Sequence, residues 1–182
     1  MPTDATKGTW LKPFDEVRRA VAHHGVWSAK LGAAGGELPA CGIHLGVFVE
    51  PFLGYVLDGT KTVESRFSVN RCAPYGRVGN GDVILLKESG GPVVGLANVR
   101  TVWSYLLDPS TWRDIRTQFA KALRIQDPEF WARRSKSEYA TLMAIDQVFA
   151  VEPVEWEKHD RRGWVVMQPA GPSALFGGED EL

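Results

Sequence analysis

The residues best suited to chemistry lie within one short segment, Gly59 to Arg66, which reads GTKTVESR. Alternation along an extended strand places Thr62, Glu64 and Arg66 on one face. Lys61 falls on the other face unless a bend at Gly59 redirects it. A hydroxyl, a carboxylate and a guanidinium together can bind the edge of a nucleobase and a phosphate in one site. The competing interpretation is an ordinary ion pair between Glu64 and Arg66 on an exposed strand, which would contribute little.

Short apolar runs around this segment predict the elements that position it. A β-branched run from Ile43 to Val49 predicts a buried strand, and Pro51 begins a short helix that Gly59 ends. Residues 61–68 read as extended. Two further strands, 82–87 and 93–103, are joined by the turn residues 89–91. The pattern is rich in antiparallel hairpins.

Helices are expected before and after this group of strands. Residues 14–27 predict one amphipathic helix that Gly25 ends, within an extension that covers residues 1–40. Asp108-Pro109 and Asp127-Pro128 each place a capping carboxylate before a proline, so two inserted helices are expected. The helical spacing of the second one continues to Leu142. Strands then follow at 145–156 and 164–167, and residues 169–182 predict a disordered acidic tail.

The order of these features resembles the ASCH domain, a family of the PUA-like superfamily. The resemblance rests on the first strand and short helix, the Gly-x-Lys-Thr-x-Glu-x-Arg element, Gly81-Asp82 at the start of an apolar strand, and Gly95 in the next strand. It implies an α+β fold, a PUA-like mixed β-barrel with a short helix after the first strand. The ASCH-like domain would span residues 41–168, with the two helices inserted and the N-terminal helical extension added.

The resemblance also implies RNA or nucleotide binding as the function. Some members of the family are hydrolases: one branch deacylates N4-acylcytidine nucleosides, and another member is a metal-dependent ribonuclease. Lys61 matches the lysine of the deacylase branch, but Glu64 stands where that branch has a threonine, so the hydroxyl is missing there. If the protein is an enzyme, Lys61 and Glu64 are the candidate catalytic residues. A binding module is the favoured reading.

Aromatic side chains near the motif are candidates for stacking on a base. The predicted ligand-binding set comprises Glu50, Phe52, Lys61, Thr62, Glu64, Arg66, Trp103 and Trp164. Core packing is the alternative role for each aromatic residue taken singly. Trp112 and Trp131, on the inserted helices, are assigned to packing.

The net charge of −1 excludes a wholly basic nucleic-acid-binding surface, but the charge is unevenly distributed. Residues 61–100 carry six basic and three acidic side chains, and residues 101–136 carry seven and four. A phosphate-binding groove there or ordinary solvated helix faces would each explain the surplus.

The remaining expectations are largely negative. Two cysteines and scattered histidines predict neither a disulfide framework nor a metal site, and no cofactor motif is present. We expect a cytoplasmic protein without membrane association, binding RNA, a nucleotide or a modified nucleoside. A protein-interaction module that uses residues 1–40 is a third possibility.

Overall fold

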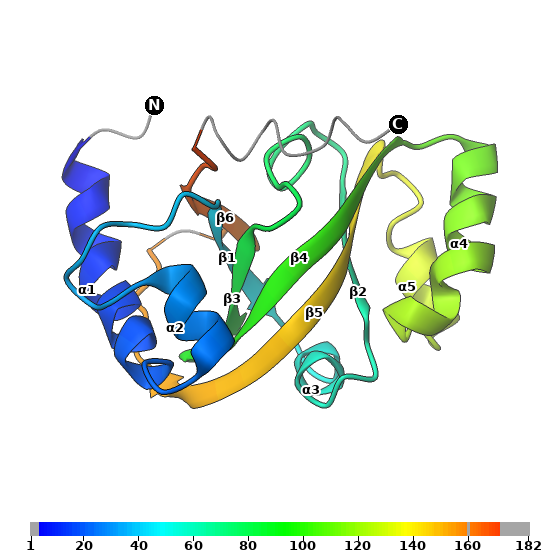
Figure 1. Ribbon diagram of the computed structural model, residues 1–182. Coiled ribbons are helices and arrows are strands. Elements are labelled where there is room, and N and C mark those ends of the chain that lie inside the picture. Colours follow the sequence, from blue (N-terminus) through cyan, green and yellow to red (C-terminus); the bar gives the residue numbers. More distant parts are fainter. Residues whose placement is uncertain (1–3, 160, 172–182) are drawn as a thin grey trace, which may run out of the picture.

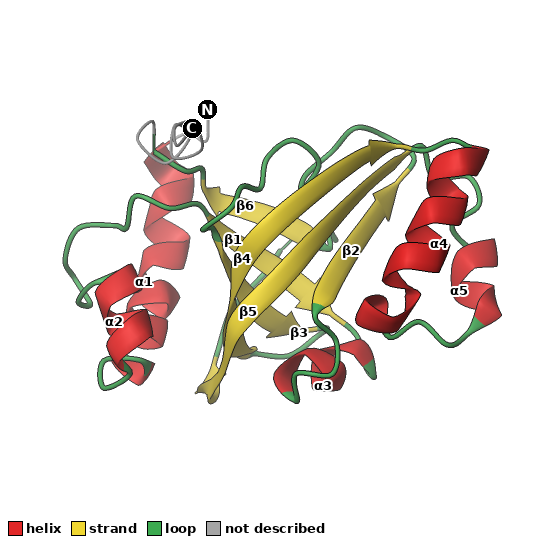
Figure 2. Ribbon diagram, turned by 45° about the vertical axis from the view of Figure 1, so that its right-hand side comes forward, coloured by secondary structure: helices red, strands yellow, loops and turns green. Residues whose placement is uncertain are grey.

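The computed structural model describes residues 4–159 and 161–171, which form a strongly curved six-stranded sheet flanked by two pairs of helices (Figure 1). The strand order is β2-β5-β4-β3-β1-β6. The strands are β1 (Ile43–Phe48), β2 (Val63–Ser68), β3 (Val83–Glu88), β4 (Val93–Leu106), β5 (Tyr139–Val154) and β6 (Trp164–Gln168). The sheet forms a half-barrel with β2 and β6 at its two ends (Figure 2).

The centre of the sheet contains both parallel and antiparallel strand pairs. β1 pairs with β3 in parallel, whereas the pairs β3–β4, β4–β5, β2–β5 and β1–β6 are antiparallel. The side chains of residues 83–87 are buried without alternation, because each face of β3 packs into a hydrophobic cluster, Val83 and Leu85 in one and Ile84 and Leu86 in the other. The predicted α+β fold with a mixed sheet is therefore confirmed.

The N-terminal segment folds as two helices, α1 (Asp4–Ala20) and α2 (Gly25–Leu31), so the prediction of one helix over 14–27 was wrong. Trp10 packs on Phe14 with ring centroids 5.4 Å apart, which extends the apolar face to the N-terminal side of Pro13. A turn interrupts the helix after Ala20. His24 then caps α2, since its Nδ1 accepts a hydrogen bond of 3.4 Å from the Trp27 backbone N–H.

These two helices share a hydrophobic cluster with β1, β3, β4 and β5. Phe14, Val17 and Trp27 are fully buried. The Trp27 indole N–H also donates to the carbonyl oxygen of Gln147 on β5, at 3.0 Å. The residues predicted as an extension therefore contribute to the same core as the sheet.

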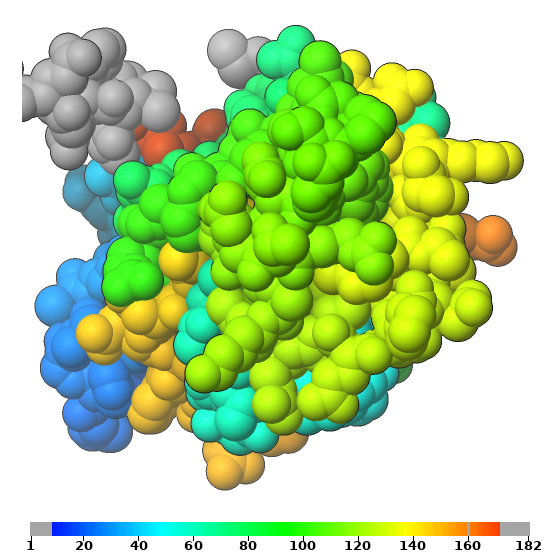
Figure 3. Space-filling view, turned by 90° about the vertical axis from the view of Figure 1, so that its right-hand side faces the viewer, coloured from blue at the N-terminus to red at the C-terminus, as the bar shows by residue number. Residues whose placement is uncertain are grey.

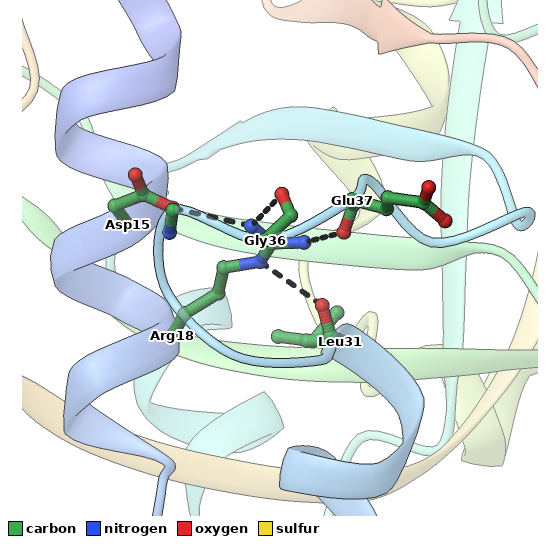
Figure 4. A network of polar contacts seen from close by, with 6 residues as sticks. Asp15, Arg18, Leu31, Gly36 and Glu37 are labelled. Atoms are coloured by element: carbon green, nitrogen blue, oxygen red, sulfur yellow. Dashed lines mark hydrogen bonds and ion pairs between the residues drawn. The ribbon is translucent and has the colours of Figure 1, made fainter.

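A buried arginine fastens the connection from α2 to β1 (Figure 4). Arg18 on α1 is 2% exposed, and its Nε donates to the carbonyl oxygen of Leu31 at 2.9 Å. Its terminal nitrogens donate to the carbonyl oxygens of Gly36 and Glu37, and Nη1 also lies 3.2 Å from Asp15 Oδ1. The Gly-rich segment that follows α2 is thus held against α1 by hydrogen bonds.

The two inserted helices are α4 (Pro109–Leu123) and α5 (Pro128–Ala132), both beginning at the predicted Asp-Pro pairs. Asp108 and Thr111 form a reciprocal capping box at the start of α4. The second helix is much shorter than predicted, because the chain from Tyr139 onward pairs with β2 and β4 on both sides. Leu142, counted above as helical, lies in β5. The predicted disordered tail, 169–182, lies for the most part outside the described residues.

Candidate functional site

A cavity of about 250 Å³ opens at the gap between the two ends of the sheet. It lies between the end of β1, the helix α3 (Phe52–Leu57), β2 and α5. Its walls are Val47, Phe48, Val49, Phe52, Lys61, Glu64, Ser65, Arg66, Phe67, Phe130 and Arg134. The motif that the sequence singled out therefore lines the cavity, together with the inserted segment.

Arg66 on β2 bridges the two ends of the half-barrel. Its Nη2 donates to the carbonyl oxygen of Val47 on β1 at 3.0 Å, and its Nη1 donates to that of Gly163, just before β6, at 2.9 Å. The guanidinium lies 4.9 Å from the ring centroid of Phe48 and 5.1 Å from that of Trp164. The side chain of Arg66 therefore connects the two ends of the sheet, which are not paired with each other.

Glu64 lies between two cationic side chains. Its Oε1 is 2.8 Å from Nε of Arg66, and its Oε2 is 3.5 Å from Nζ of Lys61. The Lys61 ammonium also donates to the carbonyl oxygen of Leu123, the last residue of α4, at 2.9 Å. Lys61 and Glu64 are 3% and 5% exposed, so water screens these interactions weakly.

Burial lowers the pKa of Lys61, because removal from water disfavours the charged form. The carboxylate of Glu64 opposes this effect and raises the pKa of Lys61, and the cation of Arg66 lowers it slightly further. The balance leaves Lys61 an easier proton donor than an exposed lysine. Such a group is suited to proton transfer as well as to hydrogen bonding.

The inserted segment adds a third cation and one aromatic ring to the cavity. Arg134 is half-buried, its guanidinium lies 3.5 Å from the centroid of Phe130, and its Nη1 donates to the carbonyl oxygen of Phe130 at 2.9 Å. Phe52 on α3 faces Phe130, with ring centroids 5.9 Å apart. Among the lining residues, three cations and one carboxylate thus face a mostly aromatic wall.

Four of the eight predicted ligand-binding residues line this cavity: Phe52, Lys61, Glu64 and Arg66. Lys61 reaches Glu64 because it precedes β2 and follows a turn at Gly59, whose φ is +78°. The strict strand alternation considered above therefore does not apply to Lys61.

The other four predicted residues lie elsewhere. Thr62 is exposed, and its backbone pairs with Ala122 and Ile145. Glu50 is exposed and accepts a hydrogen bond from the backbone N–H of Gly54. Trp103 packs on Phe119 of α4, with centroids 5.0 Å apart. Trp164 is buried behind Arg66, and its indole N–H donates to Nδ1 of His44 at 3.2 Å.

The sequence did not single out seven lining residues: Val47, Phe48, Val49, Ser65, Phe67, Phe130 and Arg134. Ser65 and Phe67 alternate with Glu64 and Arg66, and they reach the cavity because it forms at the exposed edge of β2. Phe130 and Arg134 come from the inserted segment, whose position over β2 no local pattern indicates. The Asp127-Pro128 pair predicted where the helix begins, but it did not predict the strand against which the helix packs.

The described residues contain no group of three or more His, Cys, Asp or Glu side chains that could hold a metal ion. No helix in 4–159 or 161–171 is long and apolar enough to span a membrane.

Comparisons with known proteins give information on the fold. No protein-family model and no curated protein matches the sequence significantly. The structure is similar to that of an ASCH protein from Zymomonas mobilis, with a TM-score of 0.51 and 15% sequence identity over 62% of this chain and 72% of that one. A substituted variant of the same protein gives a TM-score of 0.51 and 14% identity with the same coverage. The chain therefore has an ASCH-like fold.

Proposed function

We propose that this cavity binds a nucleobase of RNA or of a nucleotide. The observation that carries the proposal is the buried Lys61–Glu64–Arg66 chain at the wall of an aromatic cavity. A structural ion pair alone needs no adjoining space, whereas here the carboxylate and the ammonium both line the cavity. The ASCH-like fold is consistent with this function.

The geometry suggests a role for each side chain. Phe52 and Phe130 offer rings for contact with a base, which is worth about 1–3 kcal/mol per stacked base. The Glu64 carboxylate can accept from an exocyclic amino group, and the Lys61 ammonium can donate to a ring carbonyl. Because these groups are buried, a base that left them unpaired would bind far more weakly.

Arg66 has a different role from the one expected from the motif. Both of its terminal nitrogens donate to backbone carbonyls, and its Nε faces Glu64. It therefore orients the carboxylate, and contact with a phosphate falls to the half-buried Arg134 at the rim. The cavity volume is below the roughly 300–1,000 Å³ of drug-sized ligand sites, which suits a single base.

Calorimetric titration with the four ribonucleosides and their monophosphates tests the proposal. We expect at least one base to bind, its monophosphate to bind more tightly, and the gain to fall with added salt. Glu64→Gln should change which base binds best, and Arg134→Ala should remove the gain from the phosphate. Arg19→Ala, an exposed substitution on α1, is the control. If no base binds, or if Glu64→Gln leaves the preference unchanged, the proposal is wrong.

A second candidate, hydrolysis of a nucleoside amide, is favoured by the lowered pKa of Lys61 beside a carboxylate. In its neutral form Lys61 can accept a proton from a water molecule that attacks the acyl carbon, and the Glu64 carboxylate can relay that proton from the resulting ammonium to the departing amine as the carbon–nitrogen bond breaks. Incubation with N4-acetylcytidine and chromatography of the products tests this reaction. Turnover that Lys61→Met abolishes while binding persists would support an enzyme, and binding without turnover would support a binding module.

A further inference from the structure

The aromatic wall of the cavity continues outward into a second pocket. Phe67 stacks on Trp112 of α4, with centroids 5.2 Å apart and ring planes at 6°. Phe130 contacts Trp131, its neighbour in α5, edge to face at 5.2 Å. The second pocket has a volume of about 370 Å³, and its walls are Trp112, Arg116, Pro128, Trp131, Ala132 and Ser135. Phe67 and Phe130 thus separate two adjoining cavities.

The two tryptophans of this wall are only partly used in packing. Trp112 and Trp131 are both half-buried and contact each other edge to face at 6.1 Å. The guanidinium of the exposed Arg116 lies 5.5 Å from the ring centroid of Trp131. Arg113 and Arg116 also line a neighbouring hollow of α4. Figure 3 shows the face of the molecule on which α4 lies. Two indole rings and two guanidinium groups therefore line these neighbouring hollows.

We propose that the second pocket binds the next base of a single-stranded RNA whose first base lies in the 250 Å³ cavity. This inference rests on the proposed function. Aromatic rings beside arginines bind successive bases of single strands, because every base has a face that can stack. Arg134 lines the first cavity and Ser135 lines the second, so the linking phosphodiester passes the basic end of the α5 segment.

Two observations favour the tryptophan pocket as the second subsite and RNA as its ligand. The hollow on the other side of Val47 also contains basic residues, Lys87 and Arg161 among them, but Glu155 and Glu157 line it as well. Lys158 and Arg162 also line it, so it keeps a surplus of positive charge, but its single indole, Trp156, is buried. The tryptophan pocket differs in having two half-buried indoles on which a base can stack. The tryptophan pocket has Arg116 as its charged lining residue, with Arg113 in the adjoining hollow. This excess of cations favours a polyanion over an uncharged proline-rich peptide, which aromatic grooves also bind.

The test compares binding of the best mononucleotide with that of the corresponding dinucleotide and tetranucleotide. We expect the dinucleotide to bind more tightly and to quench tryptophan fluorescence. Trp131→Ala should weaken dinucleotide binding between about fivefold and a hundredfold, and by more than it weakens mononucleotide binding. Arg116→Ala, at an exposed position, tests the same pocket without disturbing the core and should reduce the salt dependence of dinucleotide binding. Arg161→Ala and Arg19→Ala are the matched controls.

The outcomes separate the two proposals. If Glu64→Gln and Arg134→Ala affect oligonucleotides but Trp131→Ala and Arg116→Ala do not, the second subsite is wrong and the base-binding cavity stands. If Arg161→Ala is the variant that weakens dinucleotide binding, the strand leaves in the other direction and this inference fails. If a proline-rich peptide binds the pocket and no oligonucleotide does, the proposed occupant is wrong. Circular dichroism of each variant verifies that it is folded.

Discussion

The Nε atom of Arg66 lies 2.8 Å from Oε1 of Glu64, while the two terminal nitrogens of the same guanidinium bind carbonyl oxygens of Val47 and Gly163. One side chain therefore orients the carboxylate of the candidate site and joins the two ends of an open sheet. The site and the closure of the half-barrel cannot be altered independently at this position.

Arg66→Lys is expected to lower the free energy of unfolding by about 2–4 kcal/mol, because a lysine cannot bind the carbonyl oxygens of Val47 and Gly163 and also keep the ion pair with Glu64. Hydrogen exchange should speed up at the backbone amides around Gly163 and Trp164. Urea unfolding and exchange measured by mass spectrometry test both effects. Arg100→Lys, on an exposed part of β4, should change neither quantity. Equal behaviour of the two variants would show that Arg66 does not fasten the barrel.

Glu64→Gln is expected to lower the pKa of Lys61 further, since the carboxylate is the group that raises it against burial. An NMR titration that follows the ε-carbon of Lys61 measures the shift directly. Glu157→Gln, at an exposed site, should leave that titration unchanged. A higher pKa of Lys61 in Glu64→Gln would contradict the geometry described.

The same lowered pKa predicts how stability depends on pH. The folded protein holds the Lys61 proton less tightly than the unfolded chain, whose pKa is close to the ordinary 10.5. The contribution of Lys61 to the free energy of unfolding should therefore increase as the pH rises from the lowered value towards 10.5. The difference in the free energy of unfolding between the wild type and Lys61→Met, measured by urea unfolding over this pH range, gives the contribution of Lys61. A constant difference between the two would contradict the prediction.

Asp82 is expected to stabilise the fold strongly at neutral pH. Burial raises its pKa, but hydrogen bonds from the His44 Nε2 and the backbone N–H groups of Gly79 and Gly42 outweigh that effect and lower it below 3.8. Asp82→Asn should cost about 3–5 kcal/mol at pH 7, because an amide cannot accept all three bonds.

The pH dependence of this cost follows from the lowered pKa of Asp82. The wild-type advantage should be constant above the ordinary value of 3.8 and shrink as the pH falls through the lowered one. Unfolding curves of both proteins from neutral to acid pH test this. Asp114→Asn, on the exposed surface of α4, should show no comparable loss. A difference that grows in acid would contradict the assignment.

Arg18 and Arg19 give a matched pair of neighbouring positions on α1. Arg18→Met should lower the free energy of unfolding by about 3 kcal/mol or more, since it leaves buried carbonyl oxygens without their donor. Arg19→Met, at an exposed position, should change it by less than about 0.5 kcal/mol. Thermal unfolding followed by circular dichroism compares them. Similar losses of unfolding free energy in the two variants would mean that the hydrogen bonds of Arg18 do not stabilise the segment after α2.

Local signals in the sequence predicted much of the fold. The β-branched run of β1, the apolar run of β3 and the Asp-Pro caps of α4 and α5 each gave an element at the right place. Helical spacing failed where tertiary pairing decided the structure: Leu142 keeps the helical period but forms β5 between two other strands. At α1 the predicted helix began at Phe14, although packing of Trp10 on Phe14 extends the helix to the N-terminal side of Pro13.

The candidate site was predictable in its centre and not at its edges. Lys61, Glu64 and Arg66 lie within one short segment, so their proximity follows from the chain itself. Arg134 lies nearly 70 residues later and reaches the cavity only because α5 packs over β2. Trp103 and Trp164 are close to the motif in the fold, but core packing decides their positions.

The indole of Trp27 binds the carbonyl oxygen of Gln147, 120 residues further along the chain. On the ribosome, the apolar faces of α1 and α2 are therefore made long before the strand that covers them. This helix pair cannot complete its own packing during synthesis, and its burial must wait for β5. The N-terminal helices are the first described elements to be translated and among the last to complete their packing.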